Sequence, residues 1–261
     1  MKIVVFVKEV PDTEANIRIN AGKNGIVEEG FQWITNPYDE FAIEEALKLK
    51  EKLGTGTVTV ITVGGDRAET LLKADVLARG VDEAVIVNDP SLTLGNPLAA
   101  AAALAKAAQK VGFDIIFAGR TGIDYDYSAA PVMAAHFLGI PYATTITKFD
   151  ISGTNVTVER DVEGGSETIA LPAPCLLTCQ KGLNEPRYPS LKGKMAAKKK
   201  TVAKYTLADL GVNASDFAPS YEAASFDPPA ARPAGRKIAA DDMAKAAAEL
   251  VSLLKNEAKV I

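Results

Sequence analysis

The chain has 261 residues, of which 48% are hydrophobic and 24% charged, and its 29 basic and 33 acidic side chains give a formal net charge of −4. These values are typical of one large or two small globular domains. With one His, two Cys and one Trp, we expect no metal site, because zinc sites of the His/Cys type need three or four such ligands. A catalytic triad would have to use His136, which lies in an apolar run and is expected in the core or on a helix face.

The sequence offers no membrane or export signal. It has no run of 18 uncharged apolar residues, and its start, MKIVVFVKEVPD, acquires charge too early for a signal peptide. Cys175 and Cys179 lie four positions apart on a predicted strand, which is too far for an unstrained disulfide. We therefore expect reduced thiols, a cytoplasmic location and no direct membrane span.

Apolar runs alternate with helical patterns through the first 140 residues. The runs span 3–7, 57–63, 83–88 and 114–119 and lack polar alternation, which indicates strands covered on both faces of a parallel sheet. Helices are predicted over 37–53, with Asn36 as N-cap, and over 66–79, 96–111 and 128–138, each followed by Gly. The sequence therefore predicts an α/β fold with a doubly wound, Rossmann-like parallel sheet of the adenine-nucleotide-binding type.

An insertion, residues 8–35, separates the first strand from the first helix. Within it we predict a hairpin that pairs 17–19 with 26–28 and turns at Asn24 and Gly25. Loops of this length at a strand's carboxyl end usually carry function.

The pattern changes after Pro141. Segments within 142–172 alternate apolar and polar residues between turns, which predicts an antiparallel extension, and PCLLTCQ then returns to the main sheet. Residues 206–236 are rich in Pro, Ala and Ser, and a helix is predicted over 239–255. We expect one domain over 1–204 and a C-terminal arm over 205–261 that packs along its own domain or against another chain.

Three segments should converge at the carboxyl edge of the sheet, where the strand order reverses. They are Lys8–Thr13, Gly64–Asp66 and the sequence GRTGIDYDYSAA at 119–130. Glycines and helix N-termini there suit a nucleotide, and ordinary strand-to-helix turns are the alternative. No GxGxxG follows the first strand and no GxxxxGK[ST] occurs, which argues against a conventional dinucleotide dehydrogenase or a P-loop NTPase.

Taken together, the segments resemble the β-subunit of electron transfer flavoprotein along nearly the whole chain. The resemblance rests on VKEVPD, NPYDEFAIEEALKLKE at 36–51, GRTGIDYD at 119–126, VERDVEGGSETIALPAPCLLT at 158–178, LNEPRYPSL and KMAAKKK. It implies an electron carrier, not an enzyme alone, in an obligate heterodimer whose α-subunit holds most of the FAD. Such a carrier takes electrons from a dehydrogenase, such as one of the acyl-CoA dehydrogenase type in fatty acid β-oxidation, and passes them to an oxidoreductase. The arm would then pack on the α-subunit.

The resemblance also implies that the crevice holds AMP or, in electron-bifurcating members that oxidise NADH, a second FAD. The matching positions are Phe6, Asn36, Pro37, Tyr38, Asp39, Gly64, Gly119, Arg120, Thr121, Gly122, Ile123, Asp124, Asp126, Ser128, Ala129 and Ala130. The match breaks where the family has Gln and Gly, because this chain has Ala129 and Pro131. We expect Ser128 to cap the following helix, and AMP to be the occupant, with altered binding. VPDT at 10–13 and NPYD at 36–39 look more like the bifurcating members, so both forms stay open.

Further positions match functional sites of the family. Leu191, with Pro189 and Lys192 in a recognition loop at 183–200, matches an exposed leucine that docks on the dehydrogenase; a core leucine is the alternative. Asp161 matches an acidic position between domains, against the alternative of a solvated carboxylate. Thr13 matches a position that faces the flavin ring.

One strongly basic segment stands out. Residues 187–204 carry seven basic side chains and no acidic one, whereas the remainder carries 22 basic against 33 acidic, a net charge of −11. The negative charge of the remainder of the chain repels the phosphates of a nucleic acid, so we expect no nucleic-acid partner. We expect instead that the basic segment steers the protein electrostatically toward an acidic protein partner. Outside the family, a nucleotide-binding sensor protein of similar fold is the alternative.

Overall fold

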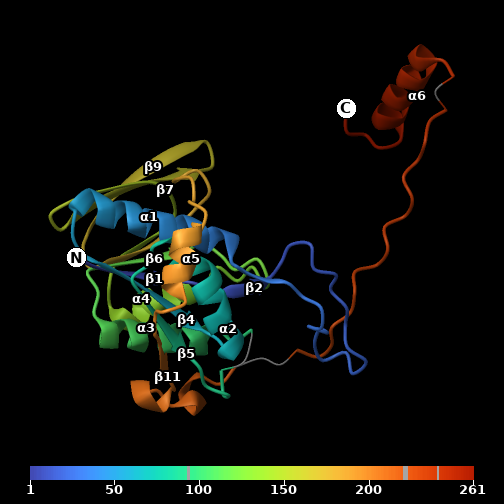
Figure 1. Ribbon diagram of the computed structural model, residues 1–261. Helices are drawn as coiled ribbons and strands as arrows, with labels where there is room; N and C mark the ends of the chain where they lie inside the picture. Colours follow the sequence, from blue (N-terminus) through green and yellow to red (C-terminus); the bar gives the residue numbers. More distant parts are fainter. Residues whose placement is uncertain (93–94, 220–222, 240) are drawn as a thin grey trace. The chain divides into compact units, whose positions relative to one another are not determined.

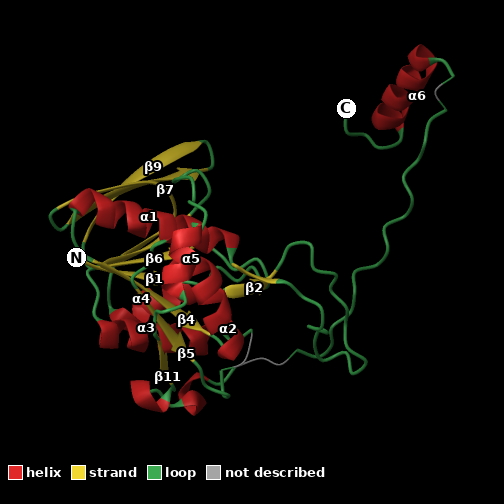
Figure 2. Ribbon diagram, in the orientation of Figure 1, coloured by secondary structure: helices red, strands yellow, loops and turns green. Residues whose placement is uncertain are grey.

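A nine-stranded sheet organises the part of the chain that this computed structural model describes, residues 1–92, 95–219, 223–239 and 241–261 (Figures 1 and 2). The strand order is β11-β5-β4-β1-β6-β10-β7-β8-β9, and β2 and β3 form a separate pair. The strands are β1 (Lys2–Phe6), β2 (Glu9–Pro11), β3 (Trp33–Thr35), β4 (Thr57–Val63), β5 (Glu83–Val87), β6 (Ile115–Gly119), β7 (Tyr142–Ser152), β8 (Asn155–Val162), β9 (Gly165–Pro172), β10 (Cys175–Cys179) and β11 (Val202–Tyr205).

Strand pairing confirms the predicted doubly wound α/β fold. All pairs from β11 to β7 are parallel, and β7, β8 and β9 are antiparallel. The chain runs from β1 outward through β4 and β5 and then crosses to β6 on the other side of β1. The order therefore reverses between β1 and β6, which is where such sheets bind ligands.

Side chains of the central strands alternate between two apolar cores. Ile3 and Val5 of β1 point into one core, and Val4 and Phe6 point into the other. Helices α1 (Pro37–Leu53), α2 (Asp66–Leu71) and α5 (Leu191–Ala197) cover the first face, while α3 (Pro97–Val111) and α4 (Ala130–Leu138) cover the second (Figure 1). Because both faces are covered, the strands are apolar without alternation, as the sequence indicated.

The helix predicted over 66–79 is wrong as a single α-helix. After α2 the chain forms a π-helical turn, η1 (Leu72–Val76), and then a 3₁₀ turn, η2 (Leu77–Arg79). The wide turn puts Asp75 where its carboxylate accepts hydrogen bonds from Thr35 and Arg79. Hydrophobic spacing carries no information about such polar contacts, and π turns often occur at functional sites.

The start of α4 also differs from the prediction. The helix begins at Ala130 with Ala129 as N-cap, and no side chain caps it. Ser128 has φ 50°, which takes it out of the helix. Ser128 is therefore not the helix cap.

The antiparallel extension and the returning strand lie where the sequence placed them. β7 and β8 pair Phe149 with Val158, and β8 and β9 pair Val158 with Ile169. Phe149 also packs edge-on against Phe117 of β6, with ring centroids 5.3 Å apart, which joins the extension to the central sheet.

The basic segment contains structure that the sequence did not reveal. Its last residues form β11, a parallel edge strand beside β5, and residues 191–197, expected in a loop, form α5. Lys204 of β11 lies 3.0 Å from both Asp66 Oδ1 and Glu69 Oε2, and Lys200 Nζ donates to Val81 O at 2.5 Å. Part of the positive charge therefore serves the fold.

The chain divides into two compact units, one of residues 1–17 and 27–223 and one of residues 18–26 and 224–261. In the first, η3 (Ala208–Leu210) and η4 (Ala214–Phe217) follow β11. In the second, the predicted hairpin is reduced to one bridge, Ile19 to Ile26, and Lys23 O accepts from Phe226 N at 2.8 Å. Its helix α6 (Met243–Asn256) is capped by Asp242; residue 240 of the predicted helix 239–255 lies outside the described residues. No described helix has both the length and the apolar character needed to cross a bilayer.

A close contact at Gly193 yields a stability prediction. Gly→Ala inside a helix normally stabilises by about 1 kcal/mol, but a Cβ at Gly193 would lie 2.0 Å from Ala78 O. We expect Gly193→Ala to lower the free energy of unfolding by about 1–3 kcal/mol through overpacking. Thermal unfolding beside Gly165→Ala, where a Cβ meets no described atom within 4 Å, measures this; an unchanged or raised melting temperature for Gly193→Ala would contradict it.

Candidate functional site

A buried carboxylate joins the loops that follow β1 and β6. Asp39, in the first turn of α1, is 4% exposed. Its Oδ2 accepts from Lys8 N at 2.6 Å, and its Oδ1 accepts from Gly119 N at 3.1 Å and from Asn36 Nδ2 at 2.9 Å. One side chain thus connects the ends of β1 and β6 at the switch point.

Asn36 fixes the next part of the same loop. It is 1% exposed, its Nδ2 also donates to Thr121 O at 2.8 Å, and its Oδ1 accepts from Ile123 N at 3.2 Å. Asn36 is the N-cap residue of α1, but its side chain makes no capping bond. The amide is therefore fully engaged with the backbone of the loop after β6, and Asn36 fixes the course of that loop.

Burial shifts the acidity of Asp39. Desolvation raises its pKa to about 7, although the N–H donors of Asn36, Lys8 and Gly119 and the Lys8 ammonium oppose the rise. A carboxyl group at the switch point that titrates near neutrality is a mark of a functional site as well as of a structural one.

Glycines at the crevice allow the backbone segments to approach closely. A Cβ on Gly119 would lie 2.1 Å from Asp39 Oδ1 and 2.8 Å from Asp39 N, so only glycine fits there. A Cβ on Gly122 would lie 2.7 Å from Asp124 Oδ1, and one on Gly64 would lie 3.2 Å from Ala68 Cβ. At Gly65 a Cβ would meet no described atom within 4 Å, which leaves that turn open to a ligand.

The loop after β6 carries polar atoms that its own chain does not satisfy. Among the described residues, Arg120 Nε, Thr121 Oγ1 and Asp124 Oδ1 are buried without a hydrogen-bond partner. Thr121 is 5% exposed, and Asp124 Oδ2 pairs with Lys8 Nζ at 2.6 Å. Buried polar groups normally have partners. Three unsatisfied atoms on neighbouring residues therefore fit a polar ligand such as a ribose or phosphate.

The far end of this loop is aromatic and conformationally unusual. Tyr125 and Tyr127 stack with centroids 5.3 Å apart, and Lys8 Nζ lies 5.3 Å from the Tyr125 ring centroid. Asp126 and Ser128 have φ values of 52° and 50°, rare for residues other than glycine. Ala129 and Ala130, at the start of α4, have no polar side chain, so only their backbone groups could contact a ligand at this end of the loop.

The remaining predicted residues occupy separate places. Pro37 and Tyr38 are half-buried at the start of α1, where Arg120 lies 4.8 Å over the Tyr38 ring. The side chain of Phe6 is 3% exposed within the core. Thr13 and Asp161 are exposed, the first bonded to Asp12 and the second on β8. The structure therefore brings together 36–39 and 119–124 but not Thr13, Asp161 or Leu191.

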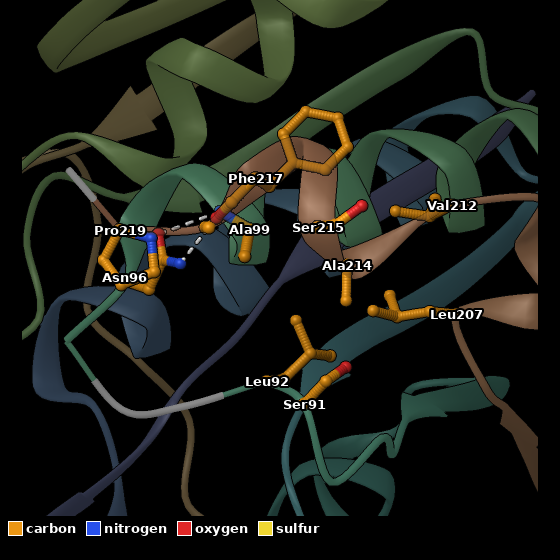
Figure 3. Close-up of a pocket in the computed structure, with 11 residues that line it drawn as sticks. Ser91, Leu92, Asn96, Ala99, Leu207, Val212, Ala214, Ser215, Phe217 and Pro219 are labelled. Carbon is orange, nitrogen blue, oxygen red and sulfur yellow. Dashed lines mark hydrogen bonds between the residues drawn. The ribbon is translucent and has the colours of Figure 1, made fainter.

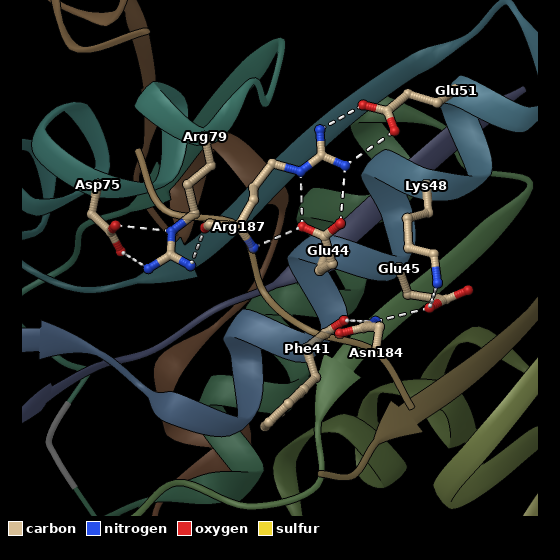
Figure 4. Close-up of polar contacts among 9 residues, drawn as sticks. All are labelled: Phe41, Glu44, Glu45, Lys48, Glu51, Asp75, Arg79, Asn184 and Arg187. Carbon is tan, nitrogen blue, oxygen red and sulfur yellow. Dashed lines mark hydrogen bonds and ion pairs between the residues drawn. The ribbon is translucent and has the colours of Figure 1, made fainter. Parts of the chain in front are cut away.

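The predicted recognition segment is held on α1 by ion pairs (Figure 4). Arg187 Nε donates to Glu44 Oε2 at 2.8 Å and its NH1 donates to Glu51 Oε1 at 2.5 Å. Leu191, the first residue of α5, is 79% exposed; Lys192 is exposed and Pro189 half-buried. From the sequence, Arg187 was recognised only as one of the seven basic residues of the segment 187–204. No sequence pattern indicated that Glu44 would pair with its guanidinium or that Arg79 would donate to its backbone oxygen.

A pocket lies away from these loops, in the same unit (Figure 3). It has a volume of about 330 Å³ and is lined by apolar side chains such as Leu92, Leu207 and Phe217. Its amide, Asn96, already accepts from Ala99 N and donates to Phe217 O. No predicted site residue lines it, so the crevice remains the candidate site. Across the described ranges, no group of three or more His, Cys, Asp or Glu side chains is arranged for a metal ion.

A doubly wound sheet whose switch-point loops carry glycines and buried, unsatisfied polar atoms is typical of α/β proteins of the nucleotide-binding type. A family model described as "Electron transfer flavoprotein domain" matches residues 23–210. The chain is 44% identical to the electron transfer flavoprotein subunit beta of Bacillus subtilis and 38% identical to that of Bradyrhizobium diazoefficiens, each over 100% of both chains. It is 34% identical to that of Mus musculus, over 100% of this chain and 99% of the mouse protein. The chain therefore belongs to the family of electron transfer flavoprotein β-subunits, which are electron carriers, and the sensor alternative falls away.

The acidity of Asp39 predicts a pH effect on stability. The folded carboxyl keeps its proton up to about pH 7, whereas its ordinary pKa is 3.8. Between these values unfolding releases a proton, so the Asp39 contribution to the free energy of unfolding falls as pH rises from about 4 to 7 and is constant above. Urea unfolding of the protein and of Asp39→Asn from pH 4 to 8 should show their difference shrinking across this window. A pH-independent difference would show that Asp39 is ionised throughout.

Proposed function

We propose that this chain is the β-subunit of a heterodimeric electron transfer flavoprotein in the cytoplasm. Its α-subunit holds most of the FAD, which supplies the redox chemistry when bound. The complex carries electrons from a dehydrogenase, of the acyl-CoA dehydrogenase type in fatty acid β-oxidation, to a downstream oxidoreductase. The observation that carries this proposal is the set of unsatisfied polar atoms in the loop after β6, at the switch point, in a chain that matches β-subunits over its full length.

The chain's own residues bind and position; they do no redox or acid–base chemistry. His136 is exposed on α4, away from the crevice loops. Cys175 and Cys179 are buried thiols, and burial raises the pKa of Cys175 to about 11. Both thiols therefore stay protonated and unreactive at neutral pH. This fits a subunit that provides a nucleotide crevice, a docking surface and an arm.

We assign AMP to the crevice in preference to a second FAD. Asn36 and Asp39 fix the loop; Arg120 Nε and Thr121 Oγ1 can donate to a phosphate or ribose oxygen, and Asp124 Oδ1 can accept from a ribose hydroxyl. Beyond them the chain offers the Ser128 hydroxyl and the amides of Ala129 and Ala130. The stacked tyrosines add bulk there, so the longer tail of FAD has fewer polar partners. The opposing observation is VPDT at 10–13, whose first two residues lie in β2 and pair with Ile34 and Trp33 of β3. An NADH-oxidising, bifurcating form is the alternative that this sequence favours.

The arm and the exposed side chains suit protein partners. No residue of α6 is buried, although Leu250, Val251 and Leu254 share one face by their spacing. The first part of the predicted arm packs on its own unit, where Leu207 and Leu210 are buried. We assign the remainder, residues 224–261, to the α-subunit, and Asp161 and Thr13 to the face near its flavin. Leu191 and Met195, which is 65% exposed, lie one turn apart on α5, and Tyr188, which is 90% exposed, lies just before the helix. We assign this apolar tip to the donor dehydrogenase.

The cofactor assignment has a direct test. We expect the co-expressed heterodimer, denatured after purification, to release one FAD and one AMP. Absorbance of the released flavin and chromatography of the nucleotides measure both. Two FAD per heterodimer would contradict the AMP assignment and favour the bifurcating form, and a chain that purifies alone without flavin would contradict the proposed function.

The docking assignment predicts a kinetic effect at Leu191. Truncation of an exposed anchor that fills a partner's pocket costs at least about 1.4 kcal/mol, or tenfold. We expect Leu191→Ala to slow flavin reduction by the donor about tenfold without change in flavin content. Leu53→Ala, at another exposed leucine (41%), is the matched control. Equal rates for Leu191→Ala and the control would refute the anchor role.

A further inference from the structure

The docking segment, residues 183–191, is not a free loop. Asn184 Nδ2 donates to Phe41 O at 3.0 Å and to Glu45 Oε2 at 2.8 Å (Figure 4). The Arg187 guanidinium spans Glu44 and Glu51, and its backbone N donates to Glu44 Oε2 at 3.0 Å. These contacts fix the segment along α1, but all of them come from one helix. These contacts with α1 do not hold the segment in the direction across the helix, toward η2.

Arg79, the last residue of η2, holds the segment in that direction. Its side chain is 7% exposed, and its NH1 donates to the backbone oxygen of Arg187 at 3.1 Å. Its Nε and NH2 form a bidentate pair with Asp75 at 2.9 and 3.1 Å, and NH2 also reaches Glu40 Oε1 at 2.5 Å. One buried guanidinium therefore joins the docking segment, the start of α1 and the π turn η1.

The two acids that bind Arg79 lie next to the crevice residues. Glu40 directly follows Asp39, and Asp75 Oδ2 accepts from Thr35 Oγ1 at 2.6 Å, immediately before Asn36. Thr35 is itself 4% exposed. Hydrogen bonds thus run from the backbone of the docking segment through Arg79 to Glu40 and, by way of Asp75, to Thr35. Glu40 and Thr35 are the direct chain neighbours of Asp39 and Asn36, so the connection to these two residues is completed by the backbone.

We propose that Arg79 is a positioning residue that sets the docking segment, and with it the apolar tip at Leu191, in its place relative to the crevice. The proposal rests on the proposed function, because it takes Leu191 as the donor-docking residue. A guanidinium suits the role because its planar set of donors reaches a carbonyl and two carboxylates at fixed angles, whereas a lysine ammonium is a single flexible point charge. Arg79 touches neither the crevice interior nor the exposed tip, so it acts through the segment.

The test uses the complete FAD-containing heterodimer with Arg79→Lys, Arg79→Met and Leu191→Ala, singly and as the Arg79→Met/Leu191→Ala pair. The readout is the rate of electron transfer from the donor dehydrogenase against heterodimer concentration, with flavin content and melting temperature measured in parallel. Arg160→Lys, which alters a guanidinium bonded to Glu167 and Thr144 away from the docking segment, is the matched control.

We expect the KM for the heterodimer to rise roughly tenfold for Arg79→Met and less for Arg79→Lys, with kcat and flavin content unchanged, as when a binding interaction alone is lost. In the Leu191→Ala background, Arg79→Met should add less than about twofold, because both changes remove the same docking contact.

Three results would overturn the inference. They are an unchanged KM in both Arg79 variants, fully multiplicative effects in the pair, or a KM effect that appears only together with lost flavin. If Leu191→Ala itself leaves transfer unchanged, the docking assignment fails, and the single Arg79 variants are then predicted to leave KM unchanged as well. If Leu191→Ala slows transfer and the Arg79 variants do not, the proposed function stands and the role of Arg79 is refuted.

Discussion

The buried carboxylate of Asp39 is the constraint on which the functional architecture depends. It lies at the point where the strand order reverses and accepts N–H groups from the ends of β1 and β6 and from Asn36. A buried acid without such donors would be costly, so the loops after both strands must keep their places. This requirement also explains Gly119, where any Cβ would meet Asp39.

Helix α1 is the common support of both proposed sites. Its N-cap Asn36 and first-turn Asp39 fix the loops of the candidate site, and its later turns present Glu44, Glu45 and Glu51 to the docking segment. Glu44 and Glu45 are 6% and 7% exposed, which is unusual for acids unless they are paired. Sites built on a rigid helix hold their geometry more precisely than sites on loops. The same helix therefore supports both the loops that we propose for a nucleotide and the segment that we propose for a donor protein.

The sequence predicted the parallel sheet, the antiparallel extension and most helix boundaries, because these follow from apolar periodicity and from Pro, Asn and Gly at helix ends. It did not predict the π turn at Leu72–Val76, whose reason is the polar contact of Asp75 with Thr35 and Arg79. It did not predict β11, because the short apolar pattern of 202–205 follows a run of lysines.

Within the candidate site, glycines and the reversal of strand order located the crevice from the sequence. Asn36 is the N-cap residue of α1, as predicted, but the bonds of its side chain could not be predicted, because the loop residues that engage its amide lie 85 and 87 positions away. Ser128 was misjudged for a similar reason, because its left-handed backbone is set by the loop that precedes α4. Long-range polar contacts are the part of the site that local patterns do not encode.

Asn36 and Asp39 fix the two loops that we propose as the binding site of an adenine nucleotide. A crystal structure of the co-purified αβ complex would show whether a nucleotide lies there. We expect electron density for an adenosine phosphate against Thr121, Asp124 and the turn at Gly64–Gly65, with Asn36 still bonded to Thr121 and Ile123. Flavin density in the α-subunit beside a crevice that holds only water would contradict it.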